Sequence, residues 1–151
     1  MQAINHALTG AVIGLTIEAP EIAIPIAITS HFALDAMPHY GPTVPDEVRL
    51  VRNRFVALLV ADAILCLLLV FLLMIRRPQN WILAVLCACA AAAPDFWSLR
   101  RFIRYRAKQP YHPGRIARFH TKIQWFQRPI GWPVEVVWFC AMSMILSTLI
   151  H

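Results

Sequence analysis

The stretch Phe55–Ile75 reads FVALLVADAILCLLLVFLLMI, and its only charged residue is Asp62. About 20 consecutive apolar residues are enough for a helix to cross the hydrocarbon core of a bilayer. Ile130–Ile150 is a second run of this kind, and Trp81–Phe96 is a shorter one built mainly from Leu, Val, Ala and Cys. These runs predict a polytopic membrane protein.

The composition of the whole chain supports this class. Of its 151 residues, 59% are hydrophobic and 15% are charged, whereas a soluble domain has about 45–50% apolar and about 25% charged residues. A soluble domain of this size buries only about 70% of the surface that its unfolded chain exposes, so it could not hide this apolar content. High hydrophobicity also excludes a disordered chain. We expect one integral membrane domain over residues 1–151.

The first forty residues predict a helical hairpin. Ala3–Ile17 and Ile22–Met37 are each short for a full span, and Glu18-Ala-Pro-Glu21 separates them. Proline interrupts helices, and the two glutamates favour water. We therefore expect an all-α bundle of about five membrane helices, of which the first two are short or tilted. Three spans with a re-entrant hairpin are the alternative.

The basic residues predict the orientation of the chain. With five spans, the loops on one side carry twelve Lys and Arg residues, including Arg49, and the loops on the other side carry two. Because Lys and Arg accumulate in cytoplasmic loops, we expect an inner (plasma) membrane protein with a cytoplasmic N-terminus. The same rule accounts for the net charge of +6. Membrane lipids are therefore the expected partners and nucleic acid is not, while the oligomeric state is left open.

A separate amphipathic helix is predicted over Tyr111–Arg128. At 100° per residue, its apolar side chains form one stripe, and Arg115, Arg118 and Lys122 form another. Such a helix lies in the membrane interface, where basic side chains meet anionic headgroups. The three basic residues are therefore candidates for binding a phosphate-bearing lipid. The alternative is a solvated basic segment. His120 lies at the edge of the apolar stripe.

The most informative polar stretch is Ser30-His31-Phe-Ala-Leu-Asp35-Ala-Met-Pro38-His39. His31 and Asp35 are four residues apart and share one helix face. Because Pro38 disfavours a helical residue before it, the helix is expected to end there, and His39 can turn back toward the same face. Imidazole and carboxylate groups at this spacing form part of a shell for zinc or a similar divalent ion. The alternative is a His–Asp hydrogen bond that fixes the helix end.

Ionisable residues from distant parts of the chain meet at the same cytoplasmic face if there are five spans. Each is a functional candidate, because ionisable groups inside a bilayer are costly. His6, Asp95 and His120 join the predicted metal ligands His31, Asp35 and His39. Asp62 and Glu135 are candidates for a general base. For Asp62 the alternative is an ion pair with Arg54, and for Asp95 one with Arg100 or Arg101.

Several short motifs carry a family resemblance. They are Asn5-His6 followed by Gly10 and Gly14, then Ser30-His31…Asp35…Pro38-His39, then Pro94-Asp95. Over roughly residues 5–120 the chain resembles the membrane-bound metal-dependent hydrolase family of bacterial inner membranes, which is regarded as related to zinc-dependent phospholipase C. The resemblance implies a small helical membrane fold and the ligands His6, Asp95 and His120.

The leading hypothesis is a membrane-embedded hydrolase that uses one or two divalent ions, with zinc expected, on an ester or phosphoester of a lipid. A transporter or channel subunit for metal ions or protons is an alternative, since intramembrane His, Asp and Glu residues also build ion paths. A non-catalytic membrane scaffold, with the polar residues joining helices, is a third.

Overall fold

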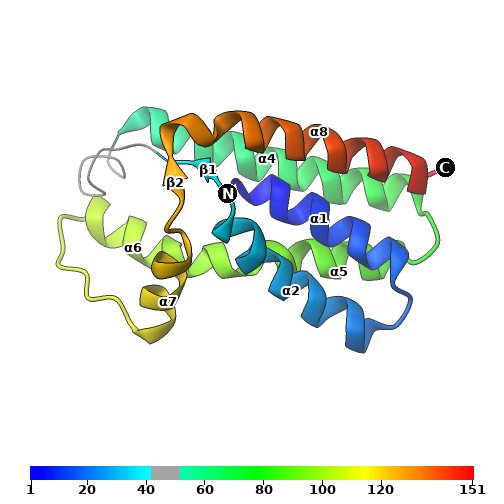
Figure 1. Cartoon of the computed structure of the whole chain (residues 1–151), viewed down its shortest axis with the longest axis horizontal. Helices are drawn as coiled ribbons and strands as arrows, with labels where there is room; N and C mark the ends of the chain where they lie inside the picture. The colour runs from blue at the N-terminus through cyan, green and yellow to red at the C-terminus, as the bar shows by residue number, and fades with distance from the viewer. Residues whose placement is uncertain (42–51) are drawn as a thin grey trace.

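The computed structural model describes residues 1–41 and 52–151, so the predicted loop residue Arg49 lies outside it. The elements in chain order are α1 (Ala3–Thr16), α2 (Pro20–Ala36), β1 (His39–Tyr40), α4 (Asn53–Arg76), α5 (Trp81–Ala92), η1 (Ala93–Asp95), α6 (Phe96–Arg106), α7 (Arg115–Ile123), β2 (Gln127–Arg128), η2 (Pro129–Gly131) and α8 (Trp132–Leu149). The long helices form a bundle, and α6, α7 and the strand pair gather at one end of it (Figure 1).

Among the described residues, three helical segments are long and apolar enough to cross a membrane: Asn53–Arg76, Trp81–Arg106 and Pro129–Leu149. They include the three long runs predicted from the sequence except for Ile150, since the last helix ends one residue earlier, at Leu149. The predicted count of five is not matched, because α1 has 14 residues and α2 has 17. At 1.5 Å per residue these helices are about 21 and 26 Å long, shorter than a hydrocarbon core of about 30 Å. Their lengths fit the alternative of three spans and a shorter hairpin.

Helix α1 lies at the centre of the bundle and contacts α2, α4, α5 and α8 (Figure 1). Its closest neighbour is α5, because small residues face each other there. A Cβ atom on Gly10 would lie 2.7 Å from the carbonyl carbon of Cys87 and 2.8 Å from Cβ of Ala91, and one on Gly14 would lie 2.6 Å from Cα of Ala84. Small side chains allow membrane helices to approach this closely. The contact fixes the position of α1 and of the polar residues near its start.

The outward faces of the bundle are apolar. Helix α4 buries Asp62, Leu69 and Leu73, whereas Leu67 is 69% exposed and Phe71 is 60% exposed. Soluble monomers rarely expose large contiguous apolar patches. This distribution suits a helix that faces lipid.

The end of α2 follows the prediction. The helix ends at Ala36, and Met37 is extended because it precedes Pro38. The chain then forms β1, which pairs in parallel with β2 and sets His39 opposite Gln127. This pairing brings the segment after α7 beside the end of α2.

The polar end of the bundle differs from the prediction in two helix lengths. The span that starts at Trp81 continues through a 3-10 turn at Pro94 into α6, because a proline without an N–H group interrupts the α-helical ladder without stopping the chain. The amphipathic helix is shorter than Tyr111–Arg128. It begins only after its N-cap Gly114, and its last predicted residues form β2 instead. Helix α7 packs against α2.

Candidate metal centre

Four of the six predicted ligands meet at the polar end of the bundle. His31 and Asp35 come from the last turns of α2, Asp95 from η1 and His120 from α7. One ligand atom from each lies within 4.8 Å of the others. Three of the side chains are buried, and that of Asp95 is 30% exposed. This group can hold a metal ion.

The four ligand atoms converge on one small volume. Nε2 of His31 lies 3.0 Å from Nε2 of His120. Oδ2 of Asp35 lies 2.8 Å from Nε2 of His120 and 3.2 Å from Nε2 of His31. Oδ1 of Asp95 lies 3.9 Å from each of the two nitrogens. Two imidazole nitrogens and two carboxylates therefore face one another.

A hydrogen bond determines which nitrogen of His31 is free to bind an ion. Nδ1 lies 2.8 Å from the carbonyl oxygen of Ala91 in α5. A carbonyl oxygen only accepts, so Nδ1 carries the proton. In the neutral ring Nε2 then has its lone pair directed toward His120 and Asp35. Histidines that bind metals are commonly oriented by such a bond to a backbone carbonyl.

His6 and His39 lie beside this group and are not part of it. The ring of His6 stacks on that of His31 with centroids 4.0 Å apart, and its Nε2 is 3.2 Å from Oδ1 of Asp35. His39 is buried, and its Nδ1 lies 2.8 Å from the carbonyl oxygen of Met37. Burial lowers the pKa of His39, which favours the neutral ring. Pairing of β1 with β2 holds His39 in the strand, so the predicted turn toward the other ligands does not bring it into the group.

The unpartnered buried nitrogens are the second observation that fits a bound ion. Within the described part of the chain, Nδ1 of His6 and Nε2 of His39 have no hydrogen-bond partner, and Nε2 of His6 lies at ion-pair distance from Oδ1 of Asp35 without hydrogen-bond geometry. Buried polar atoms without a partner are rare, and each needs an explanation such as an ion or a water. Nitrogen and oxygen donors of this kind suit zinc and related divalent ions.

The two predicted general bases hold the start of α1. Asp62 accepts hydrogen bonds from the backbone N–H groups of Ala3 (2.8 Å) and Ile4 (2.9 Å). Glu135 accepts one from the N–H group of Gln2 (2.9 Å). The first turn of a helix leaves such N–H groups open, and the helix dipole favours acids there. These contacts give both acids a role in positioning α1, and a role as general base stays a prediction.

The capping role of Asp62 leads to a stability prediction. Asp62→Ala is expected to lower the free energy of unfolding by about 1–2 kcal/mol, because one buried and one partly buried N–H group lose their acceptor. Glu21→Ala is the control, since Glu21 is an exposed carboxylate in the first turn of α2; its expected effect is within about 0.5 kcal/mol. Denaturation in detergent, followed by circular dichroism, measures both. If Asp62→Ala and Glu21→Ala lowered the free energy of unfolding equally, the hydrogen bonds of Asp62 would not specifically stabilise the start of α1.

One of the three basic residues predicted to bind substrate lines a cavity. All three are exposed; Arg118 lines a cavity next to His120, whereas Arg115 and Lys122 do not line it. All three lie within α7, at spacings of three and four residues along one face. Arg101 of α6 lines the same cavity and was not among the sequence candidates. Its place two turns after Asp95 on one helical segment was the available signal.

No family model, curated protein or solved structure matches this chain. The resemblance to the membrane-bound metal-dependent hydrolases therefore stays a prediction, and the function is argued from the residues of this chain.

Proposed function

We propose that this protein is a membrane-embedded hydrolase that depends on a divalent metal, with zinc the expected ion. Its substrate is proposed to be an ester or phosphoester of a lipid at the cytoplasmic face of the inner membrane. The observation that carries the proposal is the convergence of His31, Asp35, Asp95 and His120 at one end of an apolar bundle.

Some residues of the candidate metal centre are proposed to bind the ion, and neighbouring residues orient those ligands. His31, Asp35, Asp95 and His120 would hold a divalent ion, which would supply Lewis acidity to activate water and polarise a phosphoryl or carbonyl oxygen. His31 is oriented by its bond to the carbonyl of Ala91. Gln124 orients Asp35 through a 3.0 Å hydrogen bond from its Nε2 to Oδ2. Asp95 is the most open of the four and faces the second of the two cavities described below.

The distribution of polar residues favours a hydrolase over an ion path. A path would need polar side chains through the full depth of the bundle. The described core between α1 and α5 is instead lined by apolar side chains, among them Leu8, Ala11, Ala84 and Ala88. A site confined to one end suits a substrate that lies in the interface.

The proposal is tested by metal content and hydrolysis in the same preparation. Protein purified in detergent is expected to contain at least one equivalent of a divalent metal and to cleave a synthetic phosphoester lipid, and chelation should remove both. His120→Ala is expected to lower metal affinity by at least about tenfold. His112→Ala, which removes an exposed histidine of the loop before α7, should leave both unchanged.

Two results would contradict the proposal. One is wild-type protein without stoichiometric metal that also takes up none on titration with zinc, manganese or cobalt. The other is equal metal content in the His120→Ala and His112→Ala variants, provided that circular dichroism shows both to be folded.

A further inference from the structure

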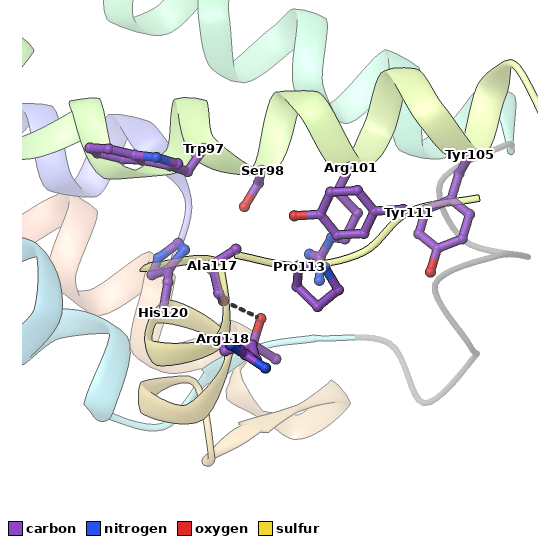
Figure 2. Close-up of a pocket in the computed structure, with 10 residues that line it drawn as sticks. Trp97, Ser98, Arg101, Tyr105, Tyr111, Pro113, Ala117, Arg118 and His120 are labelled. Carbon is purple, nitrogen blue, oxygen red and sulfur yellow. Dashed lines mark hydrogen bonds between the residues drawn. The ribbon is translucent and has the colours of Figure 1, made fainter. Parts of the chain in front are cut away.

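Two cavities flank the candidate metal centre. The first, of about 260 Å³, lies between α6 and α7 and reaches His120 (Figure 2). The second, of about 390 Å³, reaches Asp95 and the start of α1. Ser98 and Arg101 line both cavities. The guanidinium of Arg101 therefore belongs to the wall between two spaces that each touch a ligand of the centre.

The position of Arg101 follows from the helix that carries it. Ser98, Arg101 and Tyr105 follow one another at spacings of three and four residues and share one face of α6. Asp95 stands six residues before Arg101, a rise of about 9 Å along a helix. Figure 2 shows Arg101 extending from α6 toward α7, with Tyr111 beside it and Arg118 opposite. Arg101 and Arg118 thus line the same cavity that His120 reaches.

The charge of this region selects anions. Residues 96–128 contain nine Lys and Arg residues and no Asp or Glu. Among the residues that the structure describes, no acid lines the first cavity, and Arg101 in its wall is half-buried. Arginine binds phosphate through two parallel N–H groups, and partial burial strengthens such charge-assisted bonds. Phosphate is the anionic group that this geometry fits best.

We propose that the first cavity binds the phosphate group of a phosphate ester through Arg101 and Arg118, next to His120. This inference rests on the proposed function, because it assigns the phosphate to the substrate of that centre and so narrows ester or phosphoester to phosphoester. The phosphate belongs either to a lipid headgroup or to a soluble phosphate ester.

The test measures binding without turnover, in chelator-treated protein in detergent, by the change in tryptophan fluorescence as Trp97 lines the cavity. The probes are dioleoyl phosphatidic acid, dioleoylglycerol with the same chains but no phosphate, and glycerol 3-phosphate. Arg101→Gln is compared with Arg104→Gln, a matched change on the same helix. Arg104 does not line either cavity, and its side chain donates to Oε1 of Gln109 at 2.7 Å.

Arg101→Gln is expected to weaken phosphatidic acid binding by at least about tenfold, and Arg104→Gln by less than about twofold. Dioleoylglycerol should bind weakly to all three proteins. If glycerol 3-phosphate shows the same dependence on Arg101, the phosphate alone is recognised; if only phosphatidic acid does, the site takes a lipid headgroup. Equal effects of the two substitutions, or equally tight binding of dioleoylglycerol, would overturn the inference.

The two proposals fail in different ways. If the wild-type protein neither binds metal nor hydrolyses the lipid, but its binding of phosphate still depends on Arg101, the proposed hydrolase is contradicted. The proposed phosphate site in the first cavity is then retained. A metal-dependent hydrolase on which Arg101→Gln and Arg104→Gln act alike would contradict the cavity alone.

Discussion

Asp35→Asn is expected to remove the bound metal and any hydrolysis that depends on it. Asp35 is fully buried, and both of its carboxylate oxygens face potential donors. Oδ1 lies 2.5 Å from the amino group of Met1 and 3.2 Å from Nε2 of His6. Oδ2 faces His31 and His120. Asp35 therefore contacts both histidines of the centre as well as His6 and the amino group of Met1.

The substitution keeps the shape of the side chain and changes its chemistry. An amide removes the negative charge and turns one acceptor into a donor that faces other donors. Because one partner of a buried charged network is lost, we expect metal affinity to fall by at least about 100-fold and the free energy of unfolding by about 3 kcal/mol. Elemental analysis and thermal denaturation in detergent measure the two effects.

Two further variants make the result specific. Glu18→Gln neutralises an exposed carboxylate between α1 and α2 and should leave metal content and stability unchanged. Asp35→Glu retains the charge on a longer side chain and should retain part of the metal. Stoichiometric metal in folded Asp35→Asn protein would show that Asp35 is not a ligand.

Gly10→Ser is the second change with a large expected effect. A Cβ atom at this position would lie 2.7 Å from a backbone atom of Cys87, so the helix backbones of α1 and α5 have to move apart. Overpacking of this kind costs about 1–3 kcal/mol, more than the roughly 0.5 kcal/mol that replacing a helical glycine returns. Movement of α1 also displaces His6, whose ring stacks on that of the ligand His31, so metal affinity should fall as well.

Gly114→Ser is the matched control. A Cβ atom at Gly114 meets nothing within 4 Å, and Gly114 is the N-cap of α7, a position that serine favours. We expect no loss of stability there in chemical denaturation. Similar midpoints for the two variants would contradict the close approach of α1 and α5.

Part of the centre was predictable from local rules. His31 and Asp35 share a face because helix geometry sets neighbours four residues apart, and Pro38 sets the end of α2 because it restricts the residue before it. Both predictions were confirmed. Membership of Asp95 and His120 was predicted from a five-span topology that the helix lengths do not match, yet both residues join the group. The prediction that these residues lie at one end of the bundle was right, because α1 and α2 form a hairpin whether or not they span the membrane.

The sequence by itself determined the three long apolar helices, the end of α2 and the basic character of the segment after Asp95, because run length, proline and charge act within a few residues. Only the tertiary structure decided the rest. His120 lies 89 residues from His31 in the chain. Asp62 and Glu135 accept hydrogen bonds at the start of α1 and are not members of the centre. Arg101 lines the cavity next to His120. Those outcomes depend on how closely glycine and alanine allow α1 to approach α5 and on the pairing of β1 with β2. Each is a contact between segments far apart in the chain, on which helical periodicity carries no information.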